Sequence, residues 1–191
     1  MKTQVKENIL NIGVRLITQK GYNNVGIQEV LNEAHIPKGS FYHYFKSKED
    51  FGLQVISHYN KSALVHLQSY FEDKSRSPRE RMLLFFEDMK AFYTSKEYSE
   101  GCLLGNCSIE LSDNSDVLRL AIAKELNQWH SVFENCIAEA QEAGEIKSDK
   151  KASDIADFIL NSWEGALLRM KAIKTVQPLE VFVDFLRSYI I

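Results

Sequence analysis

The stretch Ile36-Pro37-Lys38-Gly39-Ser40-Phe41-Tyr42-His43-Tyr44-Phe45-Lys46-Ser47-Lys48-Glu49 is the most informative part of this chain. Three lysines, two tyrosines and a histidine occur in it, and no acidic residue precedes Glu49. Lysines neutralise phosphates, a glycine allows close approach, and hydroxyl and ring groups can contact phosphate or a thymine methyl. For the stretch alone, an amphipathic surface helix with a solvated lysine face is the alternative. What precedes the stretch favours a short helix that contacts DNA.

Two further helices are predicted upstream. The first carries apolar residues at helical spacing and ends before Gly21; these residues are Val5, Ile9, Ile12 and Leu16. The second runs from Ile27 to about Glu33, with Gly26 as its N-cap. Pro37 disfavours helix at the residue before it and presets the first turn of the third helix. A short helix, a turn and a second short helix with a polar face make a helix-turn-helix.

Residues 6–51 resemble the DNA-binding domain of the TetR family of transcriptional regulators. The resemblance rests on Gly21-Tyr22, Ile27-Gln28-Glu29-Val30, the run from Pro37 to Phe45, and Ser47-Lys48-Glu49. The sequence departs from the family pattern at Gly26, where Ser or Thr is usual, and at His35, where glycine is usual. Glycine caps a helix only slightly less well than serine, and histidine is enriched in the left-handed conformation. The fold is therefore not in question, although one phosphate-contacting hydroxyl is lost.

This resemblance implies a set of residues that contact double-stranded operator DNA. By position in the family they are Gln28, Lys38, Gly39, Ser40, Tyr42, His43 and Lys48. An amide such as Gln28 can pair with an adenine edge, and Lys38 can contact guanine or phosphate. Phe41 and Phe45 are expected to pack inward instead.

The bulk composition fits a protein that binds DNA through one face. The chain has 191 residues, 45% of them hydrophobic, and a net charge of −3. Residues 1–50 carry a net charge of +2 and the remainder carries −5. No signal-peptide pattern and no run of about 18 apolar residues is present, so a cytoplasmic protein without membrane contact is expected.

Catalysis, metals and cofactors are not expected. Cys102 and His130 could be drawn as a nucleophile and its base, but no phosphate-binding loop or hydrolase-type glycine turn accompanies them. The three cysteines, Cys102, Cys107 and Cys136, lack metal-ligand spacing and are an odd set for a disulfide framework.

Helical patterns continue to the end of the chain, so an all-α fold of about nine helices is predicted. A long helix from about Phe51 ends near Pro78, and a short helix is expected between Gly101 and Asp113. The resulting division is a helix-turn-helix domain over residues 1–47 and an effector-binding and dimerisation domain over residues 48–191.

The last helix is apolar on more than one side, which indicates burial beyond a single contact. The residues concerned include Phe182, Val183, Leu186 and Ile190. The family resemblance implies that the last two helices pair with those of a second copy, giving a homodimer. A helix packed twice within its own chain is the alternative.

The segment Gly101-Cys102-Leu103-Leu104-Gly105-Asn106 resembles a TetR subgroup that responds to electrophiles and to reactive chlorine or aldehyde species. That resemblance implies Cys102 as the sensing residue and Lys171 as a lysine on the penultimate helix beside it. A nearby ammonium lowers a thiol pKa, and the thiolate is the form that electrophiles and oxidants attack. The alternative is that Cys102 is a small buried apolar residue.

Reversible binding of an apolar small molecule in the helical body is the rival account of the effector. The candidate pocket residues are Phe86, Met89, Tyr93, Asn106, Trp129, His130, Phe133 and Trp163. Each of them could equally be plain core. A helical protein-interaction module without DNA binding is the third alternative, but it would leave residues 26–48 unexplained. A DNA-binding regulator is therefore the leading hypothesis. Release from DNA by the effector is the commoner behaviour in the family, so a repressor is expected.

Overall fold

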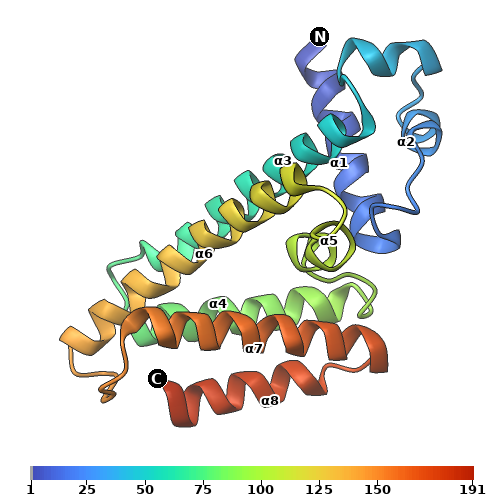
Figure 1. Ribbon diagram of the computed structural model, residues 1–191. Coiled ribbons are helices and arrows are strands. Elements are labelled where there is room, and N and C mark those ends of the chain that lie inside the picture. Colours follow the sequence, from blue (N-terminus) through green and yellow to red (C-terminus); the bar gives the residue numbers. More distant parts are fainter. Residues whose placement is uncertain (1) are drawn as a thin grey trace. The chain divides into compact units, whose positions relative to one another are not determined.

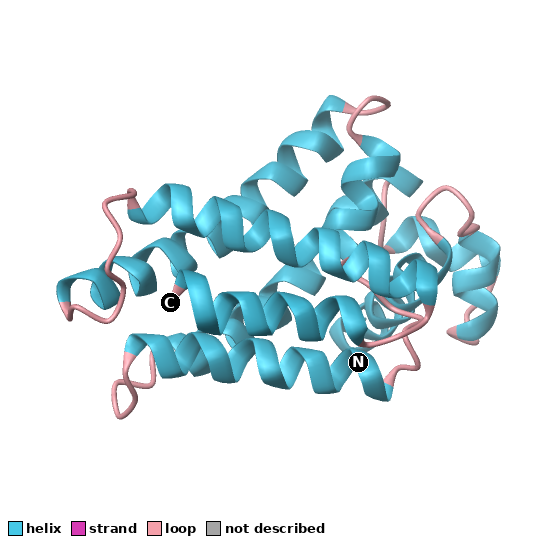
Figure 2. Cartoon of the chain, turned by 90° about the horizontal axis from the view of Figure 1, so that it is seen from below, coloured by secondary structure: helices cyan, strands magenta, loops and turns pink. Residues whose placement is uncertain are grey.

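The computed structural model describes residues 2–191, and that range is helical with no strand (Figures 1 and 2). The α-helices are α1 Lys2–Lys20, α2 Ile27–Glu33, α3 Lys48–Phe71, α4 Pro78–Ser95, α5 Leu103–Leu111, α6 Asp116–Glu142, α7 Ala152–Ile173 and α8 Gln177–Phe185. A 3-10 helix, η1, spans Lys38–His43, and a π-helical turn, Leu186–Ile190, ends the chain. The predicted all-α fold is confirmed. The third of the nine predicted helices is η1, a 3-10 helix rather than an α-helix.

Neighbouring glycine, histidine, serine and proline residues set the ends of α1, α2 and α4. Gly21 follows α1 with a φ of +83°, a conformation that L side chains rarely adopt. Gly26 is the N-cap of α2, in an extended conformation, and His35 leaves that helix with a φ of +55°. Ser77 and Glu80 form a capping box at the start of α4, with Pro78 in its first turn.

The described residues pack into two compact units. The first runs to Ser62 and includes Cys102–Glu125, and the second contains Ala63–Gly101 and Leu126–Ile191. Helices α3 and α6 contribute residues to both. The predicted DNA-binding domain, residues 1–47, lies inside the first unit, which also holds the short helix α5.

An aromatic cluster holds η1 on the first unit. Phe41 and Phe45 are fully buried, as expected, and their ring centroids lie 5.2 Å apart. Phe51 of α3 contacts both rings edge-on, at 5.9 and 5.0 Å. Ring contacts of this kind stabilise beyond the area they bury, so the short 3-10 helix is anchored from its inner side.

The core of the second unit is also aromatic. Phe86 of α4 stacks on Phe133 of α6 at 5.5 Å and contacts Trp163 of α7 at 4.9 Å. Phe182 of α8 lies 4.8 Å from Phe86 and 5.1 Å from Trp163. These four rings join α4, α6, α7 and α8 into one packed body.

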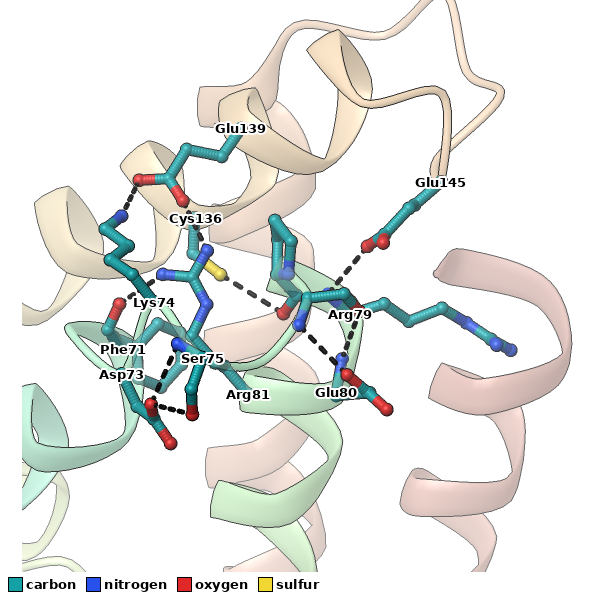
Figure 3. A network of polar contacts seen from close by, with 12 residues as sticks. Phe71, Asp73, Lys74, Ser75, Arg79, Glu80, Arg81, Cys136, Glu139 and Glu145 are labelled. Carbon is teal, nitrogen blue, oxygen red and sulfur yellow. Dashed lines mark hydrogen bonds and ion pairs between the residues drawn. The ribbon is translucent and has the colours of Figure 1, made fainter.

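A buried arginine ties the end of α3 to α4 and α6 (Figure 3). Arg81 is 2% exposed, donates to the Phe71 carbonyl oxygen and forms an ion pair with Glu139. The last carbonyls of a helix have no partner within it, so Arg81 serves as a cap for α3. Hydrogen bonds from Lys74 and Arg81 hold the pKa of Glu139 below its ordinary value.

We expect Glu139→Ala to lower the free energy of unfolding by about 2 kcal/mol, because the buried guanidinium would lose its counter-charge. The value is below that of a fully buried pair because Glu139 is 38% exposed. Its folded pKa is depressed, so its contribution is full above the unfolded-state pKa and fades as the pH falls below about 4. Denaturant titration at pH 7 and pH 3 measures both effects. Glu142→Ala, an exposed acid on the same helix, is the matched control, and equal losses in the two variants would contradict the role of Arg81.

Candidate DNA interface and effector residues

The outer side of η1 exposes polar groups beside α2. Tyr42 is 69% exposed, and His43 and Gly39 are also exposed. Ser40 is half-buried, and its backbone N–H donates to the Pro37 carbonyl at 2.9 Å. Gln28 is exposed on α2 and donates to Asn32 Oδ1 at 2.7 Å. The predicted contact residue Lys38 begins η1, and its side chain lies outside the described part of the structure.

Nothing in the described part of the structure requires glycine at position 39. Its φ lies outside the left-handed region, and an added Cβ would meet no heavy atom of the described residues within 4 Å. Gly21 contrasts with it, since a Cβ there would overlap Glu110 Oε1. The bare backbone at Gly39 therefore leaves room for something outside the chain.

Lys48 is the first residue of α3 and is held over the α1–α2 turn. Its Nζ lies 4.8 Å from the centroid of the Tyr22 ring and 3.4 Å from the Asn23 carbonyl oxygen. The Tyr22 hydroxyl donates to the Lys48 carbonyl at 3.0 Å. Burial, followed by the charge of Glu49, raises the pKa of Tyr22 to about 12, so the hydroxyl keeps its proton. An ammonium at a helix N-terminus suits a phosphate.

The start of α3 is fixed by its own capping groups. Ser47 Oγ accepts from the Asp50 backbone N–H at 3.0 Å, and Asp50 Oδ2 accepts from the Lys46 N–H at 2.7 Å. The Lys46 N–H, followed by the Gln54 side chain, holds the pKa of Asp50 below its ordinary value. The sequence analysis did not predict this cap, although the pattern Ser47-x-x-Asp50 is a local signal for it. The roles of Tyr22 and Asn23 depend on contacts made only after folding, so no local pattern indicates them.

Cys102 is the N-cap of α5. It is buried, and its Sγ accepts from the Gly105 backbone N–H at 3.5 Å. Burial raises the pKa of both Cys107 and Cys136 to about 12. Lys171 is half-buried near the end of α7. Cys102 belongs to the first compact unit and Lys171 to the second.

The predicted pocket residues are also divided between the two compact units. Phe86, Tyr93, Phe133 and Trp163 are buried in the second unit, where Met89, Trp129 and His130 are half-buried. Asn106 belongs to the first unit and donates to the Thr18 carbonyl at 3.4 Å. His130 Nε2 lies 3.2 Å from the Ser153 carbonyl oxygen and 3.4 Å from Asp157 Oδ1. Among the described residues, no group of three or more His, Cys, Asp or Glu side chains is arranged to hold a metal ion.

The predicted dimer residues lie mostly inside the protomer. Phe182, Val183 and Leu186 are buried, and Ile190 is half-buried. The exposed apolar residues of α7, α8 and the π-helical turn are Phe158, Leu168, Ile173, Val181, Phe185 and Tyr189. A groove of about 380 Å³ between α7 and α8 is bordered by Phe158, Gly165, Val181 and Phe185, with Phe182, Leu186 and Ile190 beneath.

The helix-turn-helix with an exposed polar outer face defines a DNA-binding transcriptional regulator. The sequence matches the family described as bacterial regulatory proteins, tetR family, over residues 9–55, and the tetracyclin repressor-like C-terminal domain over residues 78–186. The chain therefore belongs to the TetR family. No helix among the described residues reaches the length and apolarity of a membrane span.

Relatives match along nearly the whole chain. The HTH-type transcriptional repressor DhaR of Mycobacterium sp. (strain GP1) is 37% identical over 182 residues, covering 95% of this chain and 90% of the relative. The crystal structure of regulatory protein TetR from Rhodobacter sphaeroides has a TM-score of 0.91 at 34% identity, covering 96% and 97% of the two chains. The reduced form of E. coli NemR has a TM-score of 0.89 at 26% identity, covering 98% of both chains.

Proposed function

We propose that this protein is a cytoplasmic homodimeric repressor that binds operator DNA and is released from it when Cys102 is modified. The observation that carries the DNA-binding part is the outer face of η1, which exposes Tyr42, His43 and a glycine, Gly39, that no contact among the described residues requires. Gln28 adds an amide that can pair with a base edge, and Lys48 adds a phosphate-binding ammonium. That the relative DhaR is a repressor supports the direction of control.

Dimerisation through α7 and α8 is supported by the groove between them. Phe158, Ser162, Gly165 and Arg169 follow one another at helical spacing on α7, and all four border the groove. Gly165 is central to that row, and a Cβ there would meet no heavy atom of the described residues within 4 Å. Glycine inside a helix costs about 1 kcal/mol relative to alanine. Close approach by a helix of a second copy would explain why glycine occupies this position.

The proposed sensor is supported by the place of Cys102 in α5. A sulfur at a helix N-terminus lies at the positive end of the helix dipole, which favours the thiolate. Cys107 and Cys136 lie within helices, and their raised pKa values keep them as unreactive thiols. That a structural relative, NemR of E. coli, is known in a reduced form fits a thiol-based response.

We expect Cys102→Ser protein to bind operator DNA as wild type does and to remain bound after treatment with N-ethylmaleimide, a quinone or hypochlorite. Lys171→Ala protein should release DNA more slowly than wild type does, the outcome expected of the lysine that the family resemblance pairs with this thiol. A gel shift on the protein's own promoter region, with and without reagent, measures both effects.

Cys107→Ser and Cys136→Ser are the matched controls and should release DNA as wild type does. Release of Cys102→Ser protein by the same reagents would disprove the thiol mechanism. Reversible binding of an apolar ligand beside Phe86, Met89 and Trp129 would then become the leading account of the effector.

A further inference from the structure

Helix α5 holds the turn between α1 and α2 through its last residues. The Glu110 carboxylate accepts the Asn23 backbone N–H at 3.0 Å, through Oε2. One turn earlier on α5, Asn106 donates to the Thr18 carbonyl near the end of α1. These contacts join residues 87 and 88 positions apart in the chain, and all of them lie within the first compact unit.

The contact with Glu110 is closely fitted. Gly21 turns the chain at positive φ, and its missing side chain leaves the space that Glu110 Oε1 occupies. The two carboxylate oxygens therefore have different neighbours, Oε1 beside the bare Gly21 backbone and Oε2 on the Asn23 N–H. A charged acceptor makes a stronger hydrogen bond to a backbone N–H than a neutral one does.

Asn23 links Glu110 to Lys48. Its N–H donates to Glu110, and its carbonyl oxygen lies 3.4 Å from Lys48 Nζ. Two further hydrogen bonds fix the same region. The Tyr22 hydroxyl donates to the Lys48 carbonyl oxygen, and the Ser115 hydroxyl donates to Glu49 Oε1 at 2.7 Å. The position of the Lys48 ammonium thus depends on a turn that α5 holds in place.

We infer that Glu110 is a positioning residue for DNA binding, which holds Asn23 so that Lys48 faces a backbone phosphate. The inference rests on the proposed role of Lys48 in operator binding. Glu110 has the wrong charge to contact DNA itself, so its effect on affinity must pass through the residues it holds.

The sign of the effect separates positioning from simple electrostatics. Removing a carboxylate from a DNA-binding unit should by itself strengthen binding, because one repulsion with phosphate is lost. If Glu110 positions Lys48, Glu110→Ala should instead weaken operator binding about tenfold, the effect of losing one charge-assisted contact. It should also reduce the slope of log affinity against log salt by about one unit.

Fluorescence anisotropy with an operator duplex at several salt concentrations is the test, on full-length protein whose thermal unfolding is recorded in parallel. Glu110→Gln keeps an oxygen acceptor for the Asn23 N–H and should restore most of the affinity, although it removes the same charge. Asp113→Ala, an exposed acid just beyond α5, should bind as wild type or slightly more tightly. The double variant Glu110→Ala, Lys48→Ala should be no weaker than Lys48→Ala, because both changes remove one phosphate contact.

Three results would overturn the inference: undiminished affinity in Glu110→Ala, equal losses in Glu110→Ala and Glu110→Gln, or additive losses in the double variant. The Lys48→Ala variant distinguishes failure of the inference about Glu110 from failure of the proposed contact between Lys48 and DNA. Unchanged binding by Lys48→Ala would remove the basis of both proposals, whereas weakened binding by Lys48→Ala alone would remove only the role of Glu110.

Discussion

Phe185→Glu is expected to convert the protein from a dimer to a folded monomer and to lower operator affinity by about 100-fold or more. Phe185 is 59% exposed in the protomer and lies 5.2 Å from the ring of Tyr189, so glutamate there leaves the protomer core intact. In a dimer that closes over this face, the new carboxylate would be buried without a partner, which costs several kcal/mol. A monomer also loses simultaneous contact with two half-sites.

Sedimentation velocity at micromolar concentration gives the oligomeric state, and circular dichroism confirms the helix content. Leu120→Glu is the matched control, because Leu120 is equally exposed, at 59%, but lies on α6 and does not border the groove. It should remain a dimer and bind DNA. A wild-type monomer, or a Phe185→Glu variant that still sediments as a dimer, would end the proposal that α7 and α8 form the interface.

The second large effect is expected at the outer face of η1. Tyr42→Ala should weaken operator binding about tenfold without loss of stability, because its side chain is mostly exposed in the free protein. Phe41→Ala, one residue earlier, should instead cost about 3 to 5 kcal/mol of folding stability, because that ring is fully buried. Anisotropy titrations and thermal unfolding on the same two proteins separate these effects.

Substitution of a residue that contacts a base should have a different effect from substitution of one that contacts the phosphate backbone. Gln28→Ala should relax the preference at a single base pair, whereas Lys48→Ala should weaken binding to every duplex and flatten the salt dependence by about one unit. Lys61→Ala, an exposed lysine further along α3, serves as the control for a generic loss of positive charge. Wild-type affinity in both Tyr42→Ala and Lys48→Ala would refute the proposed docking face.

Local chemistry allowed the helix-turn-helix to be predicted from sequence. The prediction of α2 as Ile27 to about Glu33 is confirmed, because Gly26 can cap a helix and Pro37 excludes one at the preceding residue. The expected inward packing of Phe41 and Phe45 is also confirmed. These features depend on neighbours within a few residues.

Features that depend on distant contacts were not predictable in this way. Arg81 looks like any surface arginine in the sequence, and only the folded chain buries it between Phe71 and Glu139. The apolar residues of the last helix lie on several sides of it, so their pattern could not tell buried Phe182 from exposed Phe185. The contact of Glu110 with Asn23 joins residues 87 positions apart and leaves no local pattern.

The construction of η1 also makes it a starting point for protein engineering. Its inner side is fixed by Phe41, which packs against Phe45 and Phe51, while positions 39, 42 and 43 are exposed. A library randomised at these three outer positions should therefore retain mostly folded members. Selection from such a library for new target duplexes would turn the chain into a source of orthogonal switches for synthetic gene circuits, each keeping the proposed effector response.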